Sequence, residues 1–241
     1  MSGHSKWNNI KHKKEKSDAA KAKIFTKIGK EMSVAIKAGG ADPSVNSKLR
    51  DLIAKAKANN VPNENIQRTI KKFSENNDIV YEEISYEGYG PSGVAIIVET
   101  STDNRNRTAG NVRAWFNKYG GNMGQNGCVG FMFEEKGVIT IIDEDEEIDE
   151  DKLMEDALES GAEDIKSDEG EYTIYTAPAD IDAVRDAIIA LGYKIDTADL
   201  AKVPTTYVTL NSDEDIENME KMLDKFNEDD DVTAVYHNWD N

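Results

Sequence analysis

Residues 137–203 have the sequence GVITIIDEDEEIDEDKLMEDALESGAEDIKSDEGEYTIYTAPADIDAVRDAIIALGYKIDTADLAKV. Short apolar runs alternate here with longer stretches that have helical periodicity. We expect strands at 138–142, 162–167, 172–176 and 193–203, and helices at 149–160 and 181–191. This βαββαβ order is the split-βαβ, or ferredoxin-like, plan. The segment therefore predicts a ferredoxin-like α+β domain over residues 135–203.

The segments on either side of this domain each lack the strands for a complete sheet. Residues 78–134 predict strands at 80–86, 93–99 and 129–133 with a helix at 103–119. Residues 204–241 predict strands at 206–210 and 232–236 with a helix at 213–226. We therefore expect 78–134 and 204–241 to pair into one discontinuous α+β domain, into which residues 135–203 are inserted.

Residues 1–77 have a different pattern, in which apolar residues recur at helical spacing. Three successive apolar stripes predict three helices. The first stripe consists of Ile24, Phe25, Ile28, Met32, Ala35 and Ile36, the second of Leu49, Leu52, Ile53 and Ala56, and the third of Ile66, Ile70 and Phe73. Gly39-Gly40 and Asn59-Asn60-Val61-Pro62 separate them. The fold class is thus α+β and multidomain, with a small N-terminal all-α domain followed by two α+β domains.

The charges are strongly segregated along the chain. Residues 1–77 contain 17 Lys and Arg against 7 Asp and Glu, whereas residues 78–241 contain 12 against 40, within a total net charge of -18. Such asymmetry indicates a polyanion-binding module joined to acidic domains. The alternative is a lysine-rich helical surface that is merely solvated.

Fifteen residues are candidates for contact with nucleic acid, because ammonium and guanidinium groups displace counterions from phosphates and an indole stacks on bases. They are Lys6, Trp7, Lys11, Lys13, Lys14, Lys16, Lys23, Lys27, Lys30, Arg68, Lys71, Lys72, Arg105, Arg107 and Arg113. For Trp7 and the lysines at 6–16, the alternative is a solubilising tail in which Trp7 packs into the helical core. An internal ion-pair network is the alternative for the three arginines after residue 104.

Other site chemistries find little support in the sequence. Cys128 has no neighbouring His or Asn, and the acidic run 143–151 lacks the glycine and spacing of an EF-hand, so we predict no catalytic residue, metal site or cofactor. Residues 135–203 lack the aromatic-basic string of an RRM and contain 6 basic against 22 acidic residues, which disfavours RNA on their sheet. The G-x-x-G spacing at 121–124 is more typical of a tight turn than of a KH clamp.

The sequence also limits the cellular setting. No apolar run approaches the roughly 20 residues of a membrane-spanning helix. The first residues are polar and basic, without the apolar stretch of a secretion signal, and a single cysteine forms no internal disulfide. We therefore expect a cytoplasmic protein that has no membrane partner.

Several stretches occur together in the order found in one family. They are MSGHSKWNNIKHKK at 1–14, KIFTK at 23–27, NNVPNENIQR at 59–68, YEGYGPSGV at 86–94, TDNRNRT at 102–108 and GGNMG at 120–124. The chain resembles the YebC family of bacterial transcriptional regulators over essentially its whole length. Met123 and Cys128 stand where that family commonly has Leu and Ser.

The resemblance implies a cytosolic protein of three domains that binds DNA and regulates transcription. Mitochondrial relatives in the same family are translational activators, which implies a ribosome or ribosomal RNA as the alternative partner. We therefore predict a non-enzymatic nucleic-acid-binding regulator, with DNA favoured and a ribosome-associated translation factor as the alternative. A protein partner for the acidic domains remains open.

Overall fold

The structure is a computed structural model that describes residues 18–75, 80–143, 148–168 and 170–240. It divides into two compact units. The larger unit comprises the described residues of 18–130 and 208–239, and the ferredoxin-like unit comprises those of 131–207 with residue 240. The helical segment and the two flanking α+β segments therefore belong to one unit. The three domain boundaries expected from the sequence stay a proposal.

Three helices form the first part of the larger unit: α2 (Asp18–Gly39), α3 (Ser47–Ala58) and α4 (Asn63–Ser74). Their apolar stripes meet in one core that contains Met32, Leu49 and Ile66, each without exposed surface. Asn46 joins two of the helices: its Oδ1 accepts from Leu49 N at 3.1 Å, and its Nδ2 donates to the Ala35 carbonyl at 2.8 Å. This one side chain caps the start of α3 and holds it against α2.

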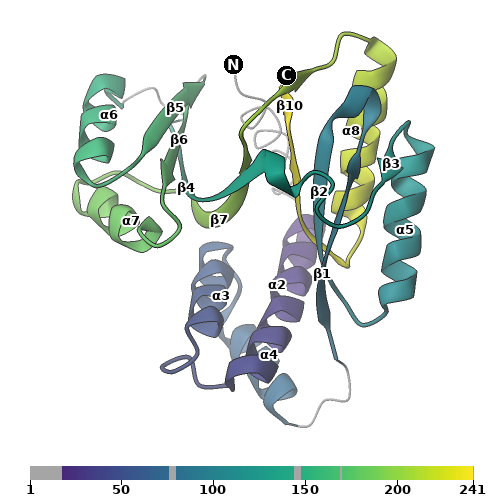
Figure 1. Cartoon of the computed structure of the whole chain (residues 1–241). Coiled ribbons are helices and arrows are strands. Elements are labelled where there is room, and N and C mark those ends of the chain that lie inside the picture. Colours follow the sequence, from purple (N-terminus) through teal and green to yellow (C-terminus); the bar gives the residue numbers. More distant parts are fainter. Residues whose placement is uncertain (1–17, 76–79, 144–147, 169, 241) are drawn as a thin grey trace. The chain divides into compact units, whose positions relative to one another are not determined.

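The second part of the larger unit is a sheet with the order β3-β1-β2-β9. Its strands and helices are β1 (Glu82–Tyr89), β2 (Ala95–Thr102), α5 (Arg105–Lys118), β3 (Asn122–Met123), α8 (Asp213–Glu228) and β9 (Val232–His237). Figure 1 shows α5 and α8 side by side, and the buried rings of Phe116 and Phe226 join them with centroids 5.2 Å apart. Pairing of β9 with β2 means that this sheet is completed from the C-terminal segment, as an inserted domain requires.

Two details of this sheet differ from the sequence expectations. The predicted strand at 129–133 is wrong, because Gly130–Met132 forms a 3-10 turn, η2, and β4 begins only at Phe133. The edge strand is instead the two-residue β3, which approaches Gly88 so closely that a Cβ there would lie 2.6 Å from the Asn122 carbonyl oxygen. Glycine is what permits this pairing.

A short connection after β1 and a separate pair of strands complete the elements outside the ferredoxin-like sheet. A 3-10 turn, η1 (Pro91–Gly93), links β1 to β2. The short strand β8 (Val208–Thr209) pairs with β10 (Trp239–Asp240) and does not join the four-stranded sheet. The C-terminal segment therefore contributes one strand to that sheet and not the two expected from the sequence.

The ferredoxin-like unit has the βαββαβ order predicted for it. Its elements are β4 (Phe133–Ile142), α6 (Glu150–Glu159), β5 (Asp164–Asp168), β6 (Glu171–Thr176), α7 (Ile181–Ala190) and β7 (Thr197–Pro204). All neighbouring strands in the sheet β5-β6-β4-β7 are antiparallel. The predicted ferredoxin-like fold is thereby confirmed.

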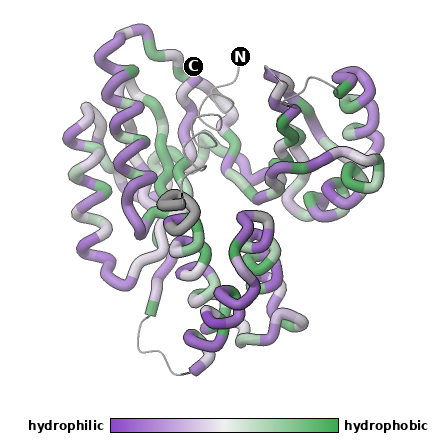
Figure 2. The backbone as a smooth tube through the Cα atoms, turned by 180° about the vertical axis from the view of Figure 1, so that it is seen from behind, coloured by the Kyte–Doolittle hydropathy of each residue, from purple (hydrophilic) through white to green (hydrophobic). Residues whose placement is uncertain are grey.

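The distribution of hydrophobic residues accounts for both cores. Ile139, Ile141 and Ile174 pack against Leu153 of α6 and Val184 of α7 in the ferredoxin-like unit. Figure 2 shows hydrophilic and hydrophobic residues alternating along the helices, as expected for helices with one face against a core. No helix in the described ranges combines the length and the apolar character that crossing a bilayer requires.

Replacing Phe226 tests the contact between α5 and α8. We expect Phe226→Ala to lower the free energy of unfolding by about 3–5 kcal/mol, because a fully buried ring is removed and leaves a cavity. Phe131→Ala is the matched control, since that ring is 75% exposed and its loss should change stability by about 0.5 kcal/mol or less. Chemical denaturation of both variants measures the difference, and equal stabilities would contradict this packing.

Candidate nucleic-acid interface

Of the fifteen predicted contact residues, six lie outside the described residues and nine lie on helices. Lys6, Trp7, Lys11, Lys13, Lys14 and Lys16 lie outside the described residues. The others lie on three helices: Lys23, Lys27 and Lys30 on α2, Arg68, Lys71 and Lys72 on α4, and Arg105, Arg107 and Arg113 on α5. Their contact with nucleic acid stays a prediction, but their surroundings within the protein can be described.

The three lysines of α2 donate hydrogen bonds to the end of α8 and the turn that follows it. Lys23 Nζ lies 3.0 Å from the Glu228 carbonyl oxygen, and Lys27 Nζ lies 3.2 Å from that of Asn227. Carbonyl groups at a helix C-terminus lack intrahelical partners and carry partial negative charge, so ammonium groups stabilise them. This row of cations therefore has partners within the protein.

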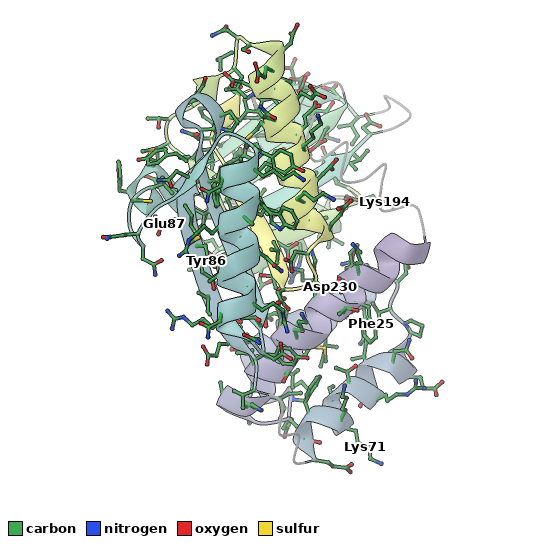
Figure 3. The ribbon with its side chains drawn as sticks, turned by 90° about the vertical axis from the view of Figure 1, so that its right-hand side faces the viewer. Phe25, Lys71, Tyr86, Glu87, Lys194 and Asp230 are labelled. Atoms are coloured by element: carbon green, nitrogen blue, oxygen red, sulfur yellow. The ribbon has the colours of Figure 1, made fainter. Side chains whose placement is uncertain are left out.

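Lys30 extends the row into a buried ionic cluster centred on Asp231. Lys30 Nζ lies 2.9 Å from the Asp230 carbonyl oxygen and 2.6 Å from Asp231 Oδ1. The other carboxylate oxygen of Asp231 accepts from Arg107 Nη2 at 2.7 Å and from Thr108 Oγ1 at 2.8 Å. Figure 3 labels Asp230 in this turn, beside α2. One carboxylate thus joins α2, α5 and the start of β9.

The electrostatics of the cluster follow from these contacts. Burial raises the pKa of Asp231, but hydrogen bonds from Lys30, Arg107 and Thr108 outweigh it and lower the pKa to about 2. The same hydrogen bond to Asp231, with a second to Asp103, raises the pKa of Arg107. Both shifts keep Asp231 and Arg107 charged at neutral pH. For Arg107, the structure shows the internal ion pairs that were the alternative to phosphate contact.

A cavity of about 430 Å³ opens beside the cluster, with Lys30, Tyr81, Arg107, Asp229 and Asp231 in its lining. Two cations in the lining face four carboxylates, those of Asp103, Asp229, Asp230 and Asp231, so the cavity has an excess of negative charge. In the described part of the chain, no three His, Cys, Asp or Glu side chains are arranged to hold a metal ion. The arrangement of the cavity suits a structural ion-pair network better than a site for acid–base chemistry.

The cations of α4 are exposed and only weakly paired. Arg68 Nη2 lies 3.1 Å from Glu64 Oε1 with its side chain 70% exposed, and Lys71 Nζ lies 3.9 Å from Glu75 Oε1 with 73% exposed. Figure 3 shows Lys71 at the outside of the molecule. Exposed ion pairs within one helix contribute only a few tenths of a kcal/mol, about 0.3–0.5. A phosphate group can therefore replace these carboxylates at little cost.

Exposed cations on α3 were missing from the predicted set. Arg50 and Lys57 are both exposed, seven residues apart and therefore on the same side of that helix. The helical spacing of Leu49, Leu52 and Ala56, which are all buried, already assigned the opposite side to the core. The same periodicity would have identified both cations. Lys48 differs, because its Nζ lies 2.8 Å from Glu83 Oε1.

The three arginines of α5 differ in their contacts with the rest of the protein. All three are exposed, but only Arg107 belongs to the ionic cluster, and its side chain is 47% exposed. Asn104 caps the helix, and its side chain accepts from Arg107 N at 3.1 Å. Of the three arginines predicted to contact nucleic acid, only Arg107 is paired with carboxylates of the protein in the described part of the chain.

The glycine-rich segment at 120–124 leads from α5 into the short strand β3, and the turn that follows it is held by a carboxylate of the protein. A Cβ at Gly121 would lie 2.5 Å from the Tyr89 carbonyl oxygen, so this position needs glycine for close packing. Farther on, Glu87 accepts from the backbone N–H groups of Gly127, Val129 and Gly130, each at 2.8 Å. These N–H groups would otherwise suit an external anion, but Glu87 already satisfies them.

Comparison with known proteins gives consistent matches along the chain. Residues 5–76 match the family model described as "TACO1/YebC protein N-terminal domain", and residues 81–239 match "TACO1/YebC second and third domain". A relative from Acetivibrio thermocellus is 55% identical over 99% of both chains, and one from Finegoldia magna is 51% identical over 100% of both. Both are named "Probable transcriptional regulatory protein".

A solved structure shows the same fold. The crystal structure of the conserved hypothetical protein Aq1575 from Aquifex aeolicus is 41% identical and superposes with a TM-score of 0.84. The match covers 92% of this chain and 91% of that one.

Replacing Asp231 tests the ionic cluster. Asp231→Asn should lower the free energy of unfolding by about 3 kcal/mol near neutral pH, because Lys30 and Arg107 lose the charge that compensates them. Asp230→Asn is the control, since Lys30 bonds to the backbone oxygen of that residue and its exposed side chain has the same charge. Equal losses in both variants would contradict the central place of Asp231.

The free energy of unfolding at acid pH tests the role of Asp231 in a second way. Because the pKa of Asp231 is about 2 in the folded chain against an ordinary 3.8, its contribution is complete above about pH 4 and disappears as the pH falls to about 2. The wild type should lose about 2 kcal/mol over that interval through this group. Asp231→Asn should show a correspondingly shallower loss in urea unfolding measured from pH 5 to pH 2.

Proposed function

The chain belongs to the TACO1/YebC family, and from that premise we propose that it is a DNA-binding regulator of transcription. The names of the relatives that match along the whole chain support a regulatory role. The exposed cations of α4 support a nucleic acid as the partner, because Arg68, Lys71 and Lys72 face solvent in a chain whose net charge is -18. This surface is the observation that carries the proposal.

The proposed contact is electrostatic and depends on the phosphate backbone. Each cation that meets a phosphate releases condensed counterions, which favours binding and makes it dependent on salt. Arg68 offers a planar fork that matches a phosphate, whereas Lys71 and Lys72 act as point charges. The basic stretch with Lys6, Lys11, Lys13, Lys14 and Lys16 and with Trp7 is part of the same proposal.

The lysines of α2 have a different place in the proposal. Lys23, Lys27 and Lys30 hold the end of α8 and so position the helical bundle on the α+β sheet. Phosphate contact by these three would require that they give up their protein partners. We therefore propose that they act by positioning, while the cations of α4 and the basic stretch before α2 contact DNA.

The charge of the acidic segment supports a separation between the residues that bind DNA and those that do not. Residues 135–203 carry a net charge of -16 from 6 basic and 22 acidic residues, so they repel a polyanion. We propose that these residues take no part in DNA binding and are available to a protein partner. We also propose that the protein acts by binding and not by catalysis.

Neutralising the α4 cations tests the proposed surface. We expect the variant Arg68→Gln, Lys71→Gln, Lys72→Gln to bind a labelled DNA duplex about 10-fold more weakly at low salt, with a salt slope reduced by roughly 0.9 per lost phosphate contact. A control with Lys152→Gln, Lys194→Gln and Lys221→Gln changes the net charge equally at exposed positions elsewhere. Fluorescence anisotropy measures both, and equal weakening would show a mere effect of net charge.

A second measurement distinguishes DNA from the ribosome as the partner. We expect gel shifts on promoter DNA that weaken steeply between about 50 and 200 mM salt, and little co-sedimentation with ribosomes at the upper value. Retention on ribosomes at high salt without a shift of DNA would contradict the DNA assignment. The α4 variant serves as the control in both assays, since either complex uses phosphate contacts.

A further inference from the structure

The outward side of α5 has an unusual composition for an exposed helix. Asn106, Gly110, Arg113 and Asn117 are spaced by three or four residues and are all exposed, opposite the buried stripe of Thr108, Val112 and Phe116. We call these four residues the α5 outer face. Figure 3 shows α5 at the front of the molecule in that view. Apart from one arginine, this face consists of glycine and amides.

Local stability does not account for these residues. Glycine within a helix is less favourable than alanine by about 1 kcal/mol, and asparagine is also a weak helix former. A Cβ at Gly110 would meet nothing within 4 Å, and its backbone is in no conformation that requires glycine. The neighbouring helix α8 instead carries the ion pair of Lys221 with Glu217 on its surface. A local departure of this kind is typical of a functional site.

The charge of α5 points to the class of its partner. Residues 105–118 contain four basic residues and no acidic one, although the whole chain has 47 Asp and Glu against 29 Lys and Arg. Among the described residues, no carboxylate forms an ion pair with Arg105, Arg113 or Lys118, whereas Arg107 pairs with Asp103 and Asp231. Two arginines in the first turn also oppose the helix dipole. A bound polyanion would compensate the charges of Arg105, Arg113 and Lys118.

We infer that the α5 outer face is a second docking surface for DNA, where the sugar-phosphate backbone approaches most closely at Gly110. Arg113 would pair with a phosphate, the amides of Asn106 and Asn117 would donate hydrogen bonds to phosphate oxygens, and the missing side chain at Gly110 would leave room for the backbone. This inference rests on the proposed function and extends it from α4 to a surface that includes amides and a glycine.

Substitution of Gly110 separates binding from stability. Gly110→Ala should raise the melting temperature by about 2–4 °C, because a better helix former enters open space. Gly110→Leu should also fold stably but should bind the labelled DNA duplex about 10-fold more weakly, since its side chain occupies the approach. Ala183→Leu is the matched control on an exposed position of α7 and should leave the affinity within about twofold.

Substitution of Arg113 tests the charge. Arg113→Gln should weaken binding about threefold and reduce the salt slope by about 0.9, the value for one phosphate contact. Arg185→Gln removes the same charge from α7, where Arg185 already pairs with Asp182 and Asp186, and should leave the slope unchanged. Measuring the same variants on an RNA duplex shows whether the surface is specific for DNA.

The outcomes distinguish this inference from the proposed function. If the α4 variant weakens DNA binding while Gly110→Leu and Arg113→Gln do not, the α5 surface is overturned and the proposed function stands. If the α5 variants weaken binding and the α4 variant does not, the α5 surface is supported and the α4 assignment fails. Losses on RNA alone, or a wild type that does not bind DNA, would overturn the α5 inference as stated.

Discussion

A single buried carboxylate, Asp231, holds together the parts of the larger unit that are farthest apart in sequence. Its side chain is 6% exposed, so it needs compensation within the protein. Lys30 supplies one cation from α2 and Arg107 supplies another from α5. Because each contact places a different helix against the start of β9, the position of the helical bundle on the sheet depends on this cluster.

The contacts of α2 also reduce the number of basic residues in 1–77 that are available to a partner. A charge count treats every lysine alike, but Lys23 and Lys27 donate hydrogen bonds to the carbonyl groups at the end of α8. The cations left for a partner are those whose protein contacts are exposed and weak, such as Arg68 and Lys71. Fewer cations are therefore available to the proposed polyanion than the net charge of the segment indicates, and they lie on particular helix faces.

The sequence predicted most elements correctly because their signals are local. The stripes of α2, α3 and α4 have helical periodicity, and the strands of the ferredoxin-like unit are short apolar runs between turns. The two-residue β3 offered no such signal, since its pairing depends on close approach of the backbone at Gly88. The 3-10 turn at Gly130–Met132 was mistaken for a strand because apolar residues there lie between glycines and the real strand β4.

The exposed cations of the candidate site were also predictable from local signals, because helical periodicity shows which side of a helix faces solvent. Periodicity alone assigned Arg68, Lys71 and Lys72 to a helix, and it would have assigned Arg50 and Lys57 in the same way. The sequence by itself determined the order of the elements, the insertion of one α+β segment within another and the segregation of charge. Only the tertiary structure decided which cations pair within the protein, because the carboxylate that pairs with Lys30 lies 201 positions away and no local pattern reveals it.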